Sequence, residues 1–534
     1  MRPSARTAIR AAVPVVVPAA VVLVGAVTLI AYSVNQWRSM QVPSWDLAIF
    51  SELAKAYAHF QAPIVPIKGE GFNLLGDHFH PILVLLGPVW RLFPTPLALL
   101  VVQDLLLAVS AWPITRLAMR TLTPWAGGAL GLFYVLSWGF QGAVSAQFHE
   151  IAFAVPMLAW ASVAFVERRW RACALWCAPL VLVKEDLGLT ILMAGLAIAL
   201  RGLQERREDR AAPTTLLGLG LTLYGLFAFL ITVLLILPAL SPSGAWEYGI
   251  GGNAGDGTAT AQSAGLLARL FSPQIKLITL GVLACTAGLI GLASPWMALV
   301  LPTLAWRFLS AKEFYWDWAN WHYNAILMPI AVGALLDVLT RLRTDREGKT
   351  LTWPDTPVLA RAIAIIGVAV PLVLAVRTAG DLPLLRTSEP IWRTGAARAA
   401  AARQVIDAVE AGEAPVPQEA VGVTRAAKIT VEEARVDFTR PAAEVRNHIL
   451  GCSPDPGVWC ELNGKRLKLY RARLAVTPSA PALPAPGELH ATKRQVFVGA
   501  GDGVLELLEV QAPGKRRMAA IDWARSGAAS GRLV

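Results

Sequence analysis

Long apolar runs recur along the first 380 residues of the chain, and short polar stretches separate them. A run of about 20 apolar residues is long enough to cross a bilayer as a helix. The pattern therefore predicts a polytopic α-helical membrane protein with about eleven spans. They are expected at about 11–34, 96–118, 122–143, 151–166, 172–183, 187–200, 214–240, 276–293, 296–310, 323–340 and 362–379.

The run from 172 to 200 is interrupted by Lys184, Glu185 and Asp186. A single helix would place these three charges near the centre of the bilayer, where they are costly. It would also move the loop "RTDREGKT" outside, although basic loops stay in the cytoplasm. Two short helices remove both conflicts. With the arginines before the first run held inside, this arrangement predicts a cytoplasmic N-terminus and a tail outside a plasma membrane.

Composition agrees with this class of protein. Hydrophobic residues make up 55% of the chain, charged residues make up 16%, and the mean hydropathy is +0.51. These values exclude a disordered chain and an ordinary soluble globular protein. The net charge of +11 could indicate nucleic-acid binding. Within the membrane part, however, most of the positive charge falls in loops that the topology places in the cytoplasm.

Five polar motifs fall on the other side of the predicted membrane: "SWDLAIF", "GDHFHP", "QFHE", "KED" and "EFYWDWANWHYN". Carboxylates, imidazoles and indoles that meet at one membrane rim are the groups that a lipid-linked polar substrate needs. The alternative is a hydrated rim of interfacial aromatics and loop charges. The predicted catalytic residue is Asp46. The predicted substrate-binding residues are Asp77, His78, His80, His149, Glu150, Lys184, Glu185, Asp186, Arg307 and His322.

Each class of residue suggests a role in transfer from a lipid phosphate. Asp46 is the expected general base, with a pKa raised by its dry setting, although an Asp after Ser44 also suits a helix N-cap. Lysine, arginine and histidine could stabilise the departing phosphate. The expected cations are Lys184, His78, His80, His322 and Arg307. A divalent metal is a second use for Asp77, His78, His80, His149 and Glu150, although no closed spacing motif is present.

The motifs "WDLAIF", "GDHFHP", "FHEIAFAVP", "KEDLGLT" and "HYNAILMPI" resemble a bacterial membrane family known as domain of unknown function 2079. The resemblance covers roughly 10–405. That family is similar in layout to GT-C glycosyltransferases, multispan enzymes that use polyprenyl-phosphate sugars. In those enzymes an acidic residue follows the first helix, and a His/Pro segment enters the next span. Asp46 and "HFHP" match this layout. The resemblance implies a GT-C-like fold over 1–380 and a polyprenyl-phosphate sugar as donor.

Past residue 380 the long apolar runs end, and shorter helix-like and strand-like segments follow. "RTGAARAAAARQVIDAVEAG" predicts an Ala-rich helix within a linker at 381–411, and "TVEE" has the spacing of a capping box. Pro441 is expected to begin a short helix that carries Val445 and Ile449. Asn463-Gly464 and Gly501-Asp502-Gly503 separate strand-like runs and predict two hairpins. Residues 412–534 therefore read as a small β-barrel of OB type.

The tail, from "AAKITVEEARVDFTRPAAEV" through "VLELLEVQAPGKRRMAAIDW", closely resembles the C-terminal barrel domain of methionyl-tRNA formyltransferase. In that enzyme the barrel helps to hold tRNA, which implies weak, nonspecific tRNA binding by this tail. The expected RNA contacts are Arg446, Lys465, Arg466, Lys468, Lys493, Arg494, Lys515, Arg516 and Arg517. No counterpart of the folate-binding catalytic domain lies upstream, so formyl transfer is not expected.

The two halves point to different compartments, because eleven spans place the tail outside, away from tRNA. A miscounted span, a gene fusion or a gene-model join near 403–415 would each account for the conflict, and the join is favoured. The sequence therefore predicts an integral membrane glycosyltransferase that acts at the outer face on a lipid-linked sugar and carries an incomplete formyltransferase-type barrel. A transporter or lipid-binding protein is the alternative, although no repeated halves with paired broken helices are visible.

Overall fold

A computed structural model describes most of the chain, and its contacts divide it into two compact units, Met1–Glu413 and Ala414–Val534. The described residues are 5–41, 43–205, 208–241, 243–244, 246, 266–310, 312–345, 349–386, 396–412, 430–452, 457–475, 484–493, 495–513, 517–525 and 531–533. The Gly-rich stretch 249–257, which the sequence suggests is a loop, lies outside them.

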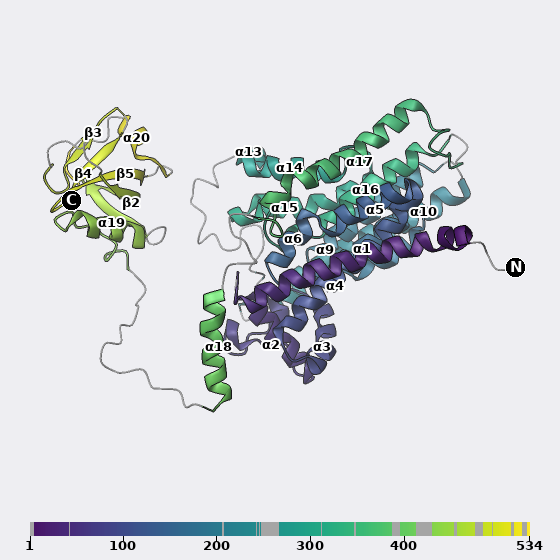
Figure 1. The fold of residues 1–534 in the computed structure, drawn as a ribbon, viewed down its shortest axis with the longest axis horizontal. Helices are drawn as coiled ribbons and strands as arrows, with labels where there is room; N and C mark the ends of the chain where they lie inside the picture. The colour runs from purple at the N-terminus through teal and green to yellow at the C-terminus, as the bar shows by residue number, and fades with distance from the viewer. Residues whose placement is uncertain are drawn as a thin grey trace. The chain divides into compact units, whose positions relative to one another are not determined.

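The first unit is helical. Figure 1 shows the long helix α1 lying along α4, with α2 and α3 grouped at one end of the unit. The helices are α1 Ala5–Arg38, α2 Asp46–Ala58, α3 Leu86–Leu92, α4 Pro96–Thr121, α5 Pro124–Val135, α6 Trp138–Ser145, α7 Ala154–Val166, α8 Trp170–Cys177, α9 Leu187–Leu203, α10 Glu208–Ile231, α11 Leu237–Leu240, α13 Leu266–Phe271, α14 Gln274–Thr286, α15 Leu301–Leu309, α16 Leu327–Leu342, α17 Val358–Thr378 and α18 Ala396–Glu410.

Five candidate membrane spans, and not eleven, are long and apolar enough among the described residues. They are Val13–Arg38, Pro96–Thr121, Asp209–Leu240, His322–Leu342 and Val358–Asp381. The other predicted segments form shorter helices. For example, the run 122–143 breaks between α5 and α6, and α14 ends at Thr286. The hydrophobic pattern located apolar helices correctly but overestimated how many are long enough to span by themselves.

The break predicted at residues 184–186 is present. A short apolar stretch ends at Leu182, and α9 begins at Leu187. The three charged residues therefore lie between two helices and not inside one. Because α9 has 17 residues, it places residues 184–186 about 25 Å from its other end.

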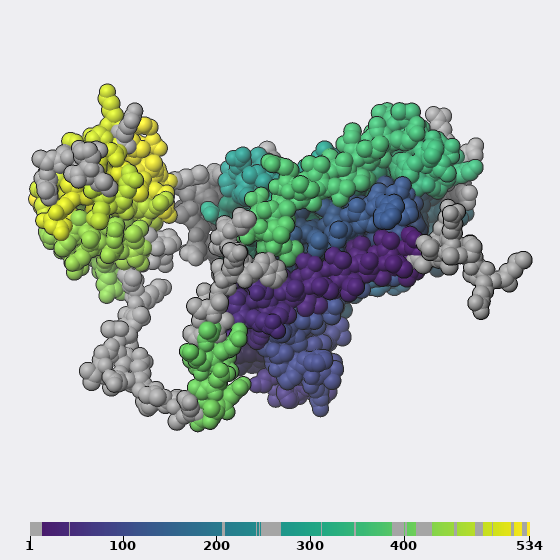
Figure 2. Space-filling view, viewed as in Figure 1, coloured from purple at the N-terminus to yellow at the C-terminus, as the bar shows by residue number. Residues whose placement is uncertain are grey.

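Many large apolar side chains are exposed on the helices of this unit, as suits a lipid environment. Leu23 on α1, Phe227 on α10 and Val376 on α17 are 63%, 56% and 79% exposed. Figure 2 shows α1 and α17 along one face of the unit. The interior also contains polar groups, since Gln103 and Asp104 on α4 are fully buried. The Gln103 amide donates a hydrogen bond to the Gln147 carbonyl and accepts one from the His149 backbone N–H, so it fixes this stretch of backbone.

The second unit is a small antiparallel half-barrel with its own hydrophobic core. The sheet order is β1-β2-β5-β4-β3, and β6 pairs with β5. The strands are β1 Val458–Leu462, β2 Lys465–Leu474, β3 Leu489–Ala491, β4 Val496–Gly499, β5 Val504–Gln511 and β6 Met518–Ala519, and the helices are α19 Ala442–Gly451 and α20 Ala520–Trp523.

Local sequence signals in the tail are mostly confirmed. Asn463 and Gly464 both have positive φ and join β1 to β2, as the Asn-Gly hairpin predicts. Helix α19 follows Pro441 and buries Val445 and Ile449. The Thr430 and Glu433 side chains exchange capping-box hydrogen bonds with the backbone at 2.8 and 3.3 Å, although only a turn follows them. The box therefore closes a turn there and does not start a regular helix.

Candidate functional site

The membrane unit contains a cavity of about 350 Å³ among the loops that join its helices. Eight of the eleven predicted site residues line this cavity: Asp46, Asp77, His78, His80, His149, Glu150, Lys184 and His322. The other three, Glu185, Asp186 and Arg307, do not line it. Helix α2, the loop before α3, the segment before α7, the break before α9 and the segment before α16 supply the eight side chains. Residues separated by up to 276 positions therefore share one cavity.

Asp46 begins α2 and faces His149. Its Oδ2 accepts a hydrogen bond from Ser44 Oγ at 2.7 Å and lies 3.4 Å from His149 Nε2. The N-cap of α2 is Trp45, so Asp46 is not the cap that the sequence allowed. The expectation of a raised pKa is wrong. Burial alone would raise it, but the hydrogen bond and charge of His149 outweigh burial, so the pKa of Asp46 is lowered.

His149 is held by its backbone and stacks on another imidazole. The Gln103 side chain accepts a hydrogen bond from the His149 backbone N–H at 3.0 Å, and His149 Nδ1 lies 3.2 Å from the Gln147 carbonyl oxygen. The rings of His149 and His322 are stacked with centroids 3.6 Å apart. Both nitrogens of His149 therefore face oxygen atoms, one of the Gln147 carbonyl and one of the Asp46 carboxylate.

Ion pairs occupy most of the charged side chains around the cavity. Lys184 Nζ lies 2.8 Å from Glu150 Oε1, and His78 Nδ1 lies 2.8 Å from Glu185 Oε1. Burial opposes the charge on Lys184. The carboxylates of Glu150, Asp186 and Glu185 outweigh burial and raise the pKa of Lys184 well above its usual value. Burial would raise the pKa of Glu185, but His78 and Lys184 lower it. Lys68 pairs in the same way with Asp77.

Asp186 and Arg307 lie behind the residues that line the cavity and form hydrogen bonds that hold its surroundings in place. Asp186 accepts a hydrogen bond from Trp306 Nε1 at 3.0 Å, and burial raises its pKa to about 6 although Lys184 opposes the shift. Arg307 is fully buried and donates to the Tyr315 carbonyl and the Asn324 side chain. The sequence placed Arg307 near a phosphate, whereas the structure uses it to hold the loop from Tyr315 to Asn324.

The sequence analysis did not predict several residues that line the cavity. Lys312 and an aromatic group line the cavity: Trp45, Phe50, Phe314, Tyr315, Trp321 and Tyr323. The density of aromatic residues in "EFYWDWANWHYN" was the available signal, and Lys312 directly precedes that motif. Trp321 has a φ of +64°, which is unusual for a bulky residue. Such strained backbone conformations cluster at functional sites.

A metal centre is not supported by the described residues, which contain no group of three His, Cys, Asp or Glu side chains placed to hold an ion. The geometry gives the reason. His149 and His322 present ring faces to each other, and Glu150 is already paired with a lysine. The side chains would have to move before they could share one cation.

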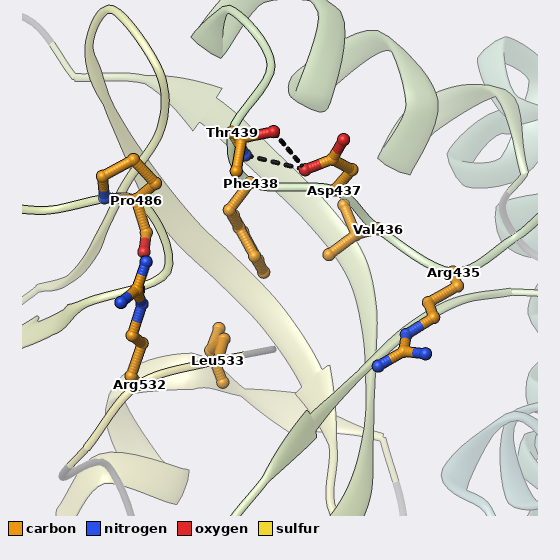
Figure 3. Close-up of a pocket in the computed structure, with 8 residues that line it drawn as sticks. All are labelled: Arg435, Val436, Asp437, Phe438, Thr439, Pro486, Arg532 and Leu533. Carbon is orange, nitrogen blue, oxygen red and sulfur yellow. Dashed lines mark hydrogen bonds between the residues drawn. The ribbon is translucent and has the colours of Figure 1, made fainter.

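A larger open groove of about 470 Å³ lies on the β unit. Figure 3 shows Phe438 between Val436 and Pro486, and Asp437 accepting hydrogen bonds from Thr439. Arg532 donates to the Pro486 carbonyl at 2.8 Å. None of the predicted site residues lines this groove, and its acidic group is satisfied locally. We therefore assign no site to it.

The predicted RNA contacts are spread over the β unit. Arg446 lies on α19, three others lie on β2, and Lys493 lies between β3 and β4. Arg466 stacks over Trp459 at 3.9 Å, whereas Arg517 pairs with Glu509. Lys465, Arg466 and Lys493 are exposed. Arg494, Lys515 and Arg516 lie outside the described residues.

Comparison with known proteins finds named relatives over part of the chain. The chain is 46% identical over 126 residues to methionyl-tRNA formyltransferase of Cutibacterium acnes, which covers 23% of this chain and 40% of that protein. It is 39% identical over 212 residues to the Streptomyces coelicolor protein of the same name, which covers 39% of this chain and 63% of the relative. The chain thus spans less than two thirds of each relative.

Family models account for more of the chain. The formyl transferase C-terminal domain matches residues 428–527. The model described as predicted membrane protein (DUF2079) matches residues 36–403, well over half of the chain, and this stretch includes every residue of the cavity. The chain therefore belongs to the DUF2079 family of predicted membrane proteins, and a formyl transferase C-terminal domain is fused to its membrane unit.

Proposed function

We propose that the membrane unit is a GT-C-type glycosyltransferase that takes a sugar from a polyprenyl-phosphate donor. The observation that carries the proposal is the cavity, where three carboxylates, four imidazoles, three lysines and several aromatic rings meet beside lipid-facing helices. Its volume of about 350 Å³ lies within the usual range for a small-molecule site. Lipid-exposed helices on the same unit would keep the prenyl chain in the bilayer while the polar head enters the cavity.

The chemistry requires one bond to form and one to break. The acceptor hydroxyl oxygen attacks the anomeric carbon of the sugar, and the bond from that carbon to the phosphate oxygen breaks. The hydroxyl proton passes to Asp46, and the electron pair leaves with the phosphate. The lowered pKa of Asp46 keeps the carboxylate ionised and ready to accept a proton, although it also makes Asp46 a weaker base.

The test is a transfer assay with the full chain in lipid nanodiscs and radiolabelled polyprenyl-phosphate hexose as donor. We expect label to leave the donor and to appear in an acceptor or in free sugar. A transporter or lipid-binding protein would leave every donor chemically unchanged. Folded protein that consumes neither hexose nor pentose donors would therefore rule out the glycosyltransferase proposal.

We also propose that the cavity faces the outside of a bacterial plasma membrane and that the N-terminus is cytoplasmic. This proposal rests on basic loops at the far end of the helices, such as the loop after α9. A single cysteine replacing exposed Gln204 should resist an impermeant thiol reagent in intact cells, and one replacing exposed Lys55 on α2 should react. The reverse labelling pattern would overturn this orientation.

For the tail, we propose weak, sequence-independent tRNA binding without formyl transfer. The fragment 412–534 has its own core and sheet, and it exposes Lys465 and Lys493. We expect an affinity near the nonspecific range of about 10⁻⁴ to 10⁻⁶ M that falls steeply with salt. Replacing both lysines with Gln should reduce the slope of log affinity against log salt by roughly 1.4–1.8. An unchanged slope, or formylation of charged tRNA by the full chain, would contradict the proposal.

A further inference from the structure

Two histidines deep in the cavity have ring nitrogens without partners. His80 and His322 are 2% and 4% exposed, and both line the cavity. The Nδ1 atom of each has no hydrogen-bond partner in the described part of the chain. A buried polar atom left unpaired loses its hydrogen bonds to water without gaining any in return, which is unfavourable. These two nitrogens therefore point to a ligand that supplies hydrogen-bonding groups at this depth.

The charge state of these imidazoles indicates which ligand groups suit them. His149 alone of the three buried histidines faces the Asp46 carboxylate, and His322 is stacked directly on it. His322 is 4% exposed and forms no ion pair with a carboxylate of the described residues, so burial favours the neutral form of its ring. Burial lowers the pKa of His80 to about 4, so this ring is also neutral near pH 7. Neutral imidazoles exchange hydrogen bonds with hydroxyl groups, and they offer no positive charge to a phosphate.

Aromatic rings complete this deep region. Phe50 packs edge-on against His80 and His149, with centroids 6.1 and 5.9 Å apart. Tyr323 lies 4.0 Å from His322, measured between ring centroids. Neutral hydrogen-bonding groups set among aromatic rings suit a ligand with both hydroxyl groups and C–H faces.

Most cations of the cavity are already neutralised. Lys184 pairs with Glu150, and Lys68 pairs with Asp77. Lys312 differs from both. It is exposed, its Nζ lies 5.6 Å from the centre of the Tyr315 ring, and no carboxylate of the described residues forms an ion pair with it. Its charge is therefore available to an anionic ligand at the exposed rim of the cavity.

We infer that the cavity has two subsites: His80 and His322 bind the hydroxyls of a neutral sugar at its depth, and Lys312 binds the phosphate at its rim. This inference rests on the proposed function and adds the direction in which the donor enters. It also removes His80 and His322 from the phosphate-stabilising role that the sequence suggested. The sugar enters first, and the phosphate and its prenyl chain stay nearer the lipid.

The test measures equilibrium binding of two radiolabelled probes to the full chain in nanodiscs. Farnesyl phosphate carries only the anion, and farnesyl phosphoryl mannose carries the anion and a sugar. Lys312→Gln should weaken both probes by about tenfold, as expected for loss of a hydrogen bond to a charged group. His322→Phe should weaken only the mannose probe by about tenfold. Lys55→Gln, an exposed lysine on α2 that does not line the cavity, is the matched control.

His322→Asn keeps a nitrogen near the Nδ1 position and should preserve the preference for the mannose probe, which a merely structural role for the ring would not predict. The inference fails if Lys312→Gln leaves the affinity for farnesyl phosphate unchanged, or if folded His322→Phe protein loses both probes equally. It also fails if the wild-type chain binds the two probes equally well or binds neither. Wild-type protein that prefers the mannose probe but never transfers the sugar would sink the proposed function and leave the two subsites standing.

Discussion

Asp46→Asn is expected to lower the rate of sugar transfer by about 100-fold or more without lowering the amount of folded protein. General-base catalysis typically contributes about 10² to 10⁴ in rate. An effect near the lower limit is expected, because His149 holds the pKa of Asp46 below its ordinary value and a weaker base contributes less. The amide of Asn can still accept the Ser44 hydrogen bond, so the substitution removes the charge and the basicity without emptying the site.

The pH dependence of the wild-type rate provides a second check on Asp46. A carboxyl whose folded pKa lies below its ordinary value of 3.8 stays ionised between pH 5 and 8. The stabilisation that comes with this ionisation is present above the unfolded pKa, and it disappears only as the pH falls through the folded value. No loss of activity between pH 8 and 5 should therefore be due to Asp46.

The matched control is Glu70→Gln, which changes an exposed carboxylate to an amide in the loop after α2. Its transfer rate should stay within about twofold of wild type, as expected for a surface change away from the cavity. Activity of the Asp46→Asn protein within about tenfold of wild type would remove Asp46 as the general base.

Much of the membrane unit could be predicted because bilayer physics constrains sequence strongly. The break at Lys184, Glu185 and Asp186 followed from the cost of three charges in lipid, and the structure has that break. The number of full spans could not be predicted in the same way. Apolar composition is equally compatible with a helix that crosses the membrane and with a shorter helix, such as α14, that ends within the bundle.

The site, too, could be predicted only in part. Residue types at one end of the predicted helices suggested which side chains would meet, and eight of them line one cavity. Their pairing could not be read from spacing, because Glu150 and Lys184 are 34 positions apart and belong to different segments. Pairing decides which charges remain available to a ligand. For this reason Lys312 was missed, and Arg307 was placed in the cavity although backbone and amide oxygens hold it in the wall.

Lys184→Met should destabilise the membrane unit more than any exposed substitution, by about 3–5 kcal/mol, because it leaves a buried carboxylate without its partner. Glu150 is only 2% exposed, and its Oε1 lies 2.8 Å from the lysine nitrogen. The double variant Lys184→Met with Glu150→Leu removes both charges and should recover most of the loss, because apolar residues of similar volume often replace a buried pair without cost. The free energy of unfolding of both variants is measured in detergent, with the helical circular dichroism signal as the monitor of unfolding.

Arg168→Met is the control for this prediction, since Arg168 is 61% exposed in its pair with Glu205, and exposed pairs contribute about 1 kcal/mol or less. The pH dependence also has a definite sign. Because the pKa of Lys184 is raised above 10.5, the stabilisation from its charge is fully present below that value, and it is lost only as the pH rises through the raised pKa. Wild-type stability should therefore not fall on this account between pH 6 and 9. If Lys184→Met costs no more than Arg168→Met, or if the double variant is less stable than the single one, then the buried pair does not stabilise this end of the bundle as described.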